Sequence, residues 1–135
     1  MAVEKIQDLG VSSNDDVVLV RQAVRTAAVE AGFNIVDQTK IVTAASELAR
    51  NTLVHGGGGS VRIELLRETA KTGLRLTFED RGPGIRDIDL AMRDGFTTGN
   101  GLGLGLGGAR RLSNEFQIHS RPGEGTRVMI ARWKA

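Results

Sequence analysis

A change of hydrophobic period near residue 60 constrains the fold of this chain more than any other feature. Before it, apolar residues recur every three or four positions, which is typical of amphipathic helices. Ser13, with Asp16 three residues later, is typical of a helix start, and Gly32 is typical of a helix end. A second helix is predicted from about Asp37 to the four glycines at 56–59. Its apolar stripe consists of Ile41, Ala44, Ala45, Leu48 and Thr52.

From Val61 onward, apolar and polar residues alternate, which predicts β-strands. Two such runs lie on either side of Thr72 and Gly73, so we expect an antiparallel hairpin that turns at these two residues. The other expected elements are a strand at 4–11, a short amphipathic segment at 88–92, a helix at 107–114 and strands at 116–120 and 127–133. This order predicts an α+β sandwich, one sheet with helices on a single face.

The composition excludes several classes of protein. A length of 135 residues suits a single domain, residues 1–135. The absence of cysteine excludes disulfides, thiolate metal sites and cysteine nucleophiles. A formal charge of +2 is too small for a protein that follows the phosphates of a nucleic acid. Because no apolar run approaches the ~20 residues of a membrane span and the start of the chain has no apolar signal-peptide core, we expect a cytoplasmic protein without membrane or nucleic-acid partners.

Glycine is concentrated in two places. Four glycines are consecutive at 56–59, and seven of the 18 glycines fall between Gly95 and Gly108, just before a predicted helix. Free backbone N–H groups before a helix are typical of phosphate-binding loops, so we expect a lid of that type here. Residues 103–108 match the dinucleotide fingerprint, but no strand precedes them, and the chain has no P-loop motif.

Glu47 and Asn51 are the first candidate site residues. They lie four residues apart on the second predicted helix, so their side chains project side by side at the border of its apolar stripe. There a carboxylate and an amide could face a pocket, and a solvated helix edge is the alternative interpretation.

Asp80 is the second candidate. It is in phase with Leu74, Leu76 and Phe78, so its side chain points to the face that these residues bury. A carboxylate in that place needs a partner, because unpaired burial is costly. A ligand could supply the partner, or the carboxylate could cap the turn at 82–84 through an Asx-type bond.

The two histidines favour structural roles. His55 comes just before the glycine run and is expected to end the helix, with a phosphate contact as the alternative. His119 alternates with Ile118 and is expected on an exposed strand face. Neither lies near a serine-centred nucleophile motif.

Four segments in order form one pattern. They are residues 47–51 (ELARN), 80–85 (DRGPGI), 101–106 (GLGLGL) and 123–126 (GEGT). This pattern resembles the GHKL ATPase superfamily, with its N box, two glycine boxes and final Gly-Thr. The short chain is similar to the small anti-sigma-type serine/threonine kinases, and above all to the stressosome switch kinases, over about residues 14–133. The glycine run at 56–59 departs from that family.

The resemblance implies a Bergerat-type fold, a mixed sheet backed by helices with ATP held under a lid. It implies that Asp80 receives the adenine amino group with support from Thr126, that Asn51 ligates Mg²⁺, and that Glu47 is the catalytic base. The implied ATP-binding residues are Asn51, Asp80, Gly82, Gly84, Ile85, Gly101, Leu102, Gly103, Leu104, Gly105, Leu106 and Thr126. An amide oxygen suits Mg²⁺, and phosphoryl transfer needs one acceptor for the hydroxyl proton.

The resemblance also implies a function. The expected enzyme is a serine/threonine kinase that phosphorylates STAS-domain stressosome proteins and then binds and activates a PPM-type phosphatase. An anti-sigma factor that sequesters a sigma subunit is one alternative, with kinase activity toward an anti-anti-sigma factor. A bare ATPase or nucleotide sensor is another.

Overall fold

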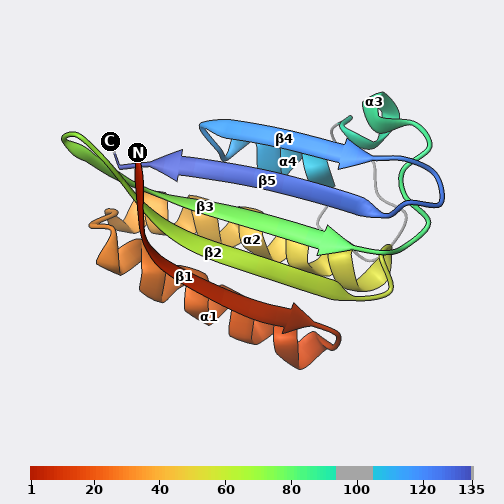
Figure 1. Ribbon diagram of the computed structural model, residues 1–135, viewed down its shortest axis with the longest axis horizontal. Coiled ribbons are helices and arrows are strands. Elements are labelled where there is room, and N and C mark those ends of the chain that lie inside the picture. The colour runs from red at the N-terminus through yellow and green to blue at the C-terminus, as the bar shows by residue number, and fades with distance from the viewer. Residues whose placement is uncertain (94–104, 135) are drawn as a thin grey trace.

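One antiparallel sheet organises the protein (Figure 1). The computed structural model describes residues 1–93 and 105–134, and within them the sheet has five strands in the order β1-β2-β3-β5-β4. The strands are β1 (Ala2–Val11), β2 (Gly59–Glu68), β3 (Lys71–Asp80), β4 (Glu115–Ser120) and β5 (Thr126–Trp133). Strands β1 and β4 form the two opposite edges of the sheet.

Helices cover one face of this sheet, behind the strands in Figure 1. They are α1 (Asn14–Glu30), α2 (Ile35–Val54) and α4 (Gly105–Arg111), while the single turn α3 (Ile88–Ala91) lies beyond the end of the strands. The predicted start of α1 is confirmed, because the Ser13 side chain accepts a hydrogen bond from the Asp16 N–H at 3.2 Å. No helix in the described ranges is long and apolar enough to cross a bilayer.

The core lies between the helices and the sheet. Strand positions that alternate toward the helices are buried, among them Val61, Leu76, Phe78 and Ile130. The predicted stripe of α2 is confirmed, since all five of its residues are buried. Helix α2 packs against β3, and a Cβ on Gly56, just after the helix, would lie 2.3 Å from Asp80 Cγ, so the C-terminal end of α2 meets the end of β3.

The α+β sandwich is confirmed with one correction to its sheet. Every strand pairing is antiparallel, so the sheet is not mixed. The two long helices, α1 and α2, lie in the chain between β1 and β2, which pair as antiparallel neighbours.

The predicted hairpin turn at Thr72 and Gly73 is wrong. The turn lies at residues 69–70, where Thr69 has φ +45°, and β3 already begins at Lys71. Gly73 is a strand residue that pairs with Trp133. A Cβ on Gly73 would lie 2.7 Å from Cε3 of that indole, so glycine is needed there for the ring to pack over the strand.

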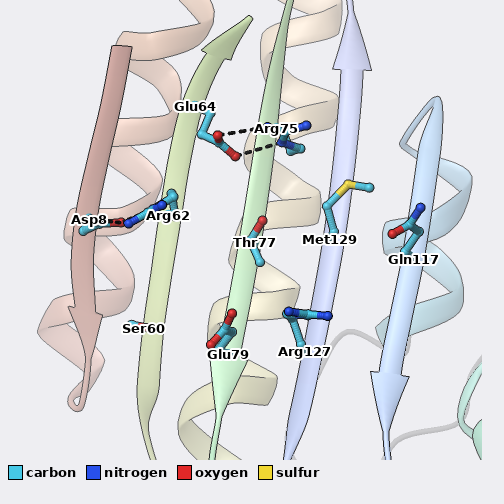
Figure 2. Close-up of a pocket in the computed structure, with 10 residues that line it drawn as sticks. All are labelled: Asp8, Ser60, Arg62, Glu64, Arg75, Thr77, Glu79, Gln117, Arg127 and Met129. Carbon is cyan, nitrogen blue, oxygen red and sulfur yellow. Dashed lines mark hydrogen bonds and ion pairs between the residues drawn. The ribbon is translucent and has the colours of Figure 1, made fainter. Parts of the chain in front are cut away.

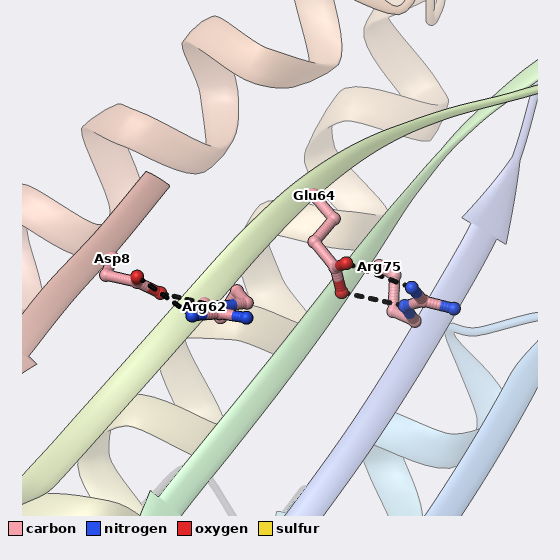
Figure 3. Close-up of polar contacts among 4 residues, drawn as sticks. All are labelled: Asp8, Arg62, Glu64 and Arg75. Carbon is pink, nitrogen blue, oxygen red and sulfur yellow. Dashed lines mark hydrogen bonds and ion pairs between the residues drawn. The ribbon is translucent and has the colours of Figure 1, made fainter. Parts of the chain in front are cut away.

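The other face of the sheet carries polar side chains around a hollow open to solvent (Figure 2). Its lining residues are Asp8, Ser60, Arg62, Glu64, Arg75, Thr77, Glu79, Gln117, Arg127 and Met129. Two ion pairs cross this face, as Figure 3 shows: Arg62 Nε lies 2.8 Å from Asp8 Oδ1, and Arg75 Nε lies 2.8 Å from Glu64 Oε1. Because these charges neutralise each other, the hollow is not an obvious receptor for an anion.

Candidate functional site

The candidate site lies on the helix side of the sheet, at the end where β3 stops. Antiparallel register places Ser120, Thr126, Asp80 and Gly59 in one row across β4, β5, β3 and β2. The last turns of α2 reach the same end, where the Gly58 N–H donates to the Thr52 carbonyl at 2.9 Å. The structure therefore brings together residues that the sequence separates by up to 74 positions, from Thr52 to Thr126.

Asp80 both caps a turn and keeps a free oxygen. Its Oδ1 accepts a hydrogen bond from the Gly82 N–H at 2.9 Å, so the turn-capping interpretation is confirmed. Its Oδ2 has no hydrogen-bond partner among the residues that the structure describes. The side chain is half-buried, so this second oxygen remains available to a ligand donor. Capping and ligand binding are compatible here, because each uses a different carboxylate oxygen.

The loop after Asp80 is packed too closely for larger residues. A Cβ on Gly82 would lie 2.6 Å from the Gly56 Cα, which places the loop against the C-terminal end of α2. Gly84 has φ +78°, and a Cβ there would lie 2.0 Å from the Arg121 carbonyl oxygen in the β4–β5 turn. The two glycines therefore allow the loop to pack against both the end of α2 and the β4–β5 turn, and these three segments form one side of the candidate site.

The hydroxyl groups of Ser120 and Thr126 lie on the β4–β5 side of this loop, and Ser120 binds it directly. Ser120 Oγ accepts a hydrogen bond from the Ile85 N–H at 2.8 Å and lies 2.8 Å from Thr126 Oγ1. It also donates to the Gly125 carbonyl at 3.0 Å. The sequence pattern had not indicated Ser120, although its phase with Phe116 and Ile118 at a strand end, just before a Pro-Gly turn, was a usable signal.

Glu47 and Asn51 lie one turn apart on α2. Glu47 is only 5% exposed, deeper than the border position expected from the sequence, and it has no hydrogen-bond or ion-pair partner among the described residues. Asn51 is half-buried. Among the described residues, Arg132 Nε is the one side-chain polar atom that is fully enclosed without a hydrogen-bond partner, so the Glu47 carboxylate oxygens keep some contact with solvent and remain open to a ligand.

The structure describes some of the remaining candidate residues and not others. His55 is the exposed C-cap of α2 and His119 lies on an exposed strand face, as expected. Gly105 and Leu106 form the start of α4, with the Leu106 side chain buried in the core. The predicted lid and the site residues Gly101, Leu102, Gly103 and Leu104 lie outside the described residues.

The donor set around Asn51 fits Mg²⁺. Within residues 1–93 and 105–134, no three acidic or histidine side chains gather into a metal cage. Mg²⁺ does not require one, since it is usually held by one or two protein oxygens together with phosphates and water. Asn51 is a half-buried amide one helical turn after the buried Glu47, so its side-chain oxygen could serve as one such ligand.

Comparisons with known proteins agree with this architecture. Residues 36–135 match the family described as "Histidine kinase-, DNA gyrase B-, and HSP90-like ATPase". The chain is 48% identical over 118 residues to Serine/threonine-protein kinase RsbT of Bacillus subtilis (strain 168), covering 87% of this chain and 89% of that one. It is 29% identical over 127 residues to Anti-sigma F factor of Thermoanaerobacter sp. (strain X514), covering 90% and 88%.

A solved structure shares the fold. The RsbU and RsbW domains of a Mycobacterium tuberculosis protein match with a TM-score of 0.67 and 22% identity. The match covers 95% of this chain and 31% of that longer chain. At this identity the likeness concerns the fold alone.

Proposed function

This chain belongs to the histidine kinase-, DNA gyrase B- and HSP90-like ATPase family and is an ATP-dependent serine/threonine kinase, and we propose that it phosphorylates a STAS-domain protein. The kinase then binds and activates a PPM-type phosphatase, as one component of a stress-signalling, partner-switching module in the cytoplasm. The observation that carries the proposal is Glu47, which is 5% exposed, has no hydrogen-bond partner within residues 1–93 and 105–134, and lies one helical turn before Asn51.

Asp80 and Thr126 are proposed to select the nucleotide. The free Oδ2 of Asp80 is an acceptor, and adenine offers an amino group as donor. Guanine presents a carbonyl oxygen at the same ring position, which would face a carboxylate. The pocket is therefore expected to prefer ATP over GTP, with the Thr126 hydroxyl as a second contact.

Asn51 and Glu47 are proposed to serve the transfer itself. Asn51 would hold Mg²⁺, which neutralises phosphate charge. Glu47 would take the proton from the serine or threonine hydroxyl of the partner. As that proton leaves, the hydroxyl oxygen bonds to the γ-phosphorus, the bond to the β,γ-bridging oxygen breaks, and ADP departs. A carboxylate that accepts no hydrogen bond from the described part of the chain is suited to accept that proton.

An anti-sigma factor is the second candidate function. The 29% identity to Anti-sigma F factor over 90% of the chain favours it. The identity to the kinase is higher over a similar share of the chain. A bare ATPase or nucleotide sensor, the third candidate, would not need a docked protein hydroxyl.

One experiment separates these candidates. The full chain is incubated with γ-labelled ATP, Mg²⁺ and a STAS-domain protein from the same organism, and binding to a sigma subunit is titrated in parallel. Label on a serine or threonine of the STAS protein supports the proposal. Tight sigma binding without transfer would favour the anti-sigma function, and ATP hydrolysis without either would favour the ATPase.

A further inference from the structure

Ser120 makes three contacts with a single hydroxyl. Its Oγ lies 2.8 Å from the Ile85 backbone nitrogen, 3.0 Å from the Gly125 carbonyl oxygen and 2.8 Å from Thr126 Oγ1. A serine hydroxyl offers one proton and two lone pairs. The three contacts therefore use everything that this hydroxyl can offer.

The polarity of two of these contacts is fixed. The Ile85 N–H can only donate, so it occupies one lone pair of Ser120. The Gly125 carbonyl can only accept, so it receives the single Ser120 proton. Only one lone pair then remains for Thr126, and the Thr126 hydroxyl must donate its proton to Ser120.

This orientation determines what Thr126 presents to a ligand. With its proton directed at Ser120, the half-buried Thr126 hydroxyl has only lone pairs left. Asp80 lies directly opposite Thr126 on β3, and its free Oδ2 is also an acceptor. Directly paired side chains on antiparallel strands have Cβ atoms about 4.5–5.5 Å apart. Two acceptors at that spacing suit a group with two N–H donors.

We propose that Ser120 is a specificity-determining positioning residue, which turns Thr126 into an obligate acceptor and so makes the site select an amino group over a carbonyl oxygen. The inference rests on the proposed adenine contact of Asp80. It adds that discrimination at the purine 6-position depends on a hydroxyl that does not itself touch the nucleotide.

The test compares ATP with inosine triphosphate, which carries a carbonyl oxygen where ATP has its amino group. In Ser120→Ala the Thr126 hydroxyl is free to rotate and donate to that oxygen. The ratio of the two dissociation constants, inosine triphosphate over ATP, is expected to fall by roughly 3- to 10-fold. Ser120→Thr keeps the hydroxyl and is expected to keep the wild-type ratio.

Two further variants test whether the change in the ratio comes from the orientation of the Thr126 hydroxyl or from a general loss of protein stability. Thr72→Val removes a hydroxyl that donates to the Ala31 carbonyl at the far end of β3, and it should leave the ratio unchanged. In a Thr126→Val background, Ser120→Ala should change the ratio no further, because no hydroxyl is left to rotate. Should Ser120→Ala not fold, Ser120→Cys gives the same comparison, since a thiol is a weak donor and acceptor.

The outcomes distinguish this inference from the proposed function. A wild type that prefers ATP, and loses affinity for it in Asp80→Asn, but keeps its ratio in Ser120→Ala would overturn the role of Ser120 alone. Equal weakening of both nucleotides in that variant would also overturn it, because it would show a purely structural contact. A wild type that binds both nucleotides equally, with no effect of Asp80→Asn, would instead reject the proposed adenine contact.

Discussion

Asp80 and Thr126 are direct cross-strand partners at the end of the antiparallel pair β3–β5, with both side chains on the helix side of the sheet. The Asp80 Oδ1 is used by the Gly82 N–H, and the Thr126 hydroxyl lies 2.8 Å from Ser120 Oγ. Each side chain is therefore fixed from outside the site and keeps acceptor capacity toward it. We propose that this pair underlies the predicted preference for ATP.

Asp80→Asn should weaken ATP binding by roughly 10- to 100-fold, because a hydrogen bond to a charged group is worth about 1.5–3 kcal/mol. The amide oxygen of asparagine can still accept from the Gly82 N–H, so the fold should survive. Titration calorimetry measures the affinity and thermal unfolding checks the fold. Asp16→Asn, at a carboxylate that accepts from the Ser12 N–H at 2.9 Å, is the control and should bind ATP normally. Unchanged affinity in Asp80→Asn would remove this residue from the site, and unfolding would leave only its turn-capping role.

Asn51→Ala should abolish Mg²⁺-dependent phosphoryl transfer while the protein stays folded, since the side chain is half-buried rather than part of the core. Its backbone carbonyl, which accepts from the His55 N–H at 2.9 Å, is unaffected by the substitution. Transfer rates across a range of Mg²⁺ concentrations test this. A variant that transfers phosphate at the wild-type rate would show that another group holds the metal.

The ion pair between Arg75 and Glu64, on the solvent-facing side of the sheet, should make the stability of the protein depend on pH. The hydrogen bond from Arg75 holds the pKa of Glu64 below its ordinary value, against the opposing effect of burial. Glu64 therefore contributes stability above the unfolded-state pKa of about 4.3, and loses it as the pH falls through the lower folded-state pKa. Urea unfolding measured from pH 7 to pH 3 should show a smaller loss of unfolding free energy in Glu64→Gln than in the wild type. Identical pH profiles would contradict this role.

The neighbouring ion pair between Arg62 and Asp8 provides a matched comparison for the effect of burial on stability. Arg75→Met leaves the largely buried Glu64 carboxylate unpaired and should cost about 1–3 kcal/mol of unfolding free energy at pH 7. Arg62→Met breaks a similar pair with Asp8, but both of those side chains are more than half exposed, so the loss should be smaller. Equal losses would show that burial does not govern the strength of these pairs.

Local signals predicted the two long helices and the direction of the Asp80 side chain. The Ser13 cap, the α2 stripe and the phase of Asp80 depend on neighbours a few positions away, and all three are confirmed. The hairpin turn was misplaced because Gly73 is explained by Trp133, 60 positions later. Ser120 was missed for a similar reason, since two of its partners are recognised only when the Ile85 loop and the start of β5 are folded beside it. The proposed roles of Glu47, Asn51 and Asp80 remain predictions.

Glu47→Gln tests the central claim most directly, through the single-turnover rate of phosphate transfer to the STAS-domain partner at saturating Mg-ATP. Glutamine keeps the shape of the buried side chain but cannot take the hydroxyl proton. The rate should fall by something like 10²- to 10⁴-fold, the usual contribution of a positioned general base, while Mg-ATP and the partner still bind. A variant that transfers phosphate as fast as the wild type would contradict the assignment of Glu47 as the base.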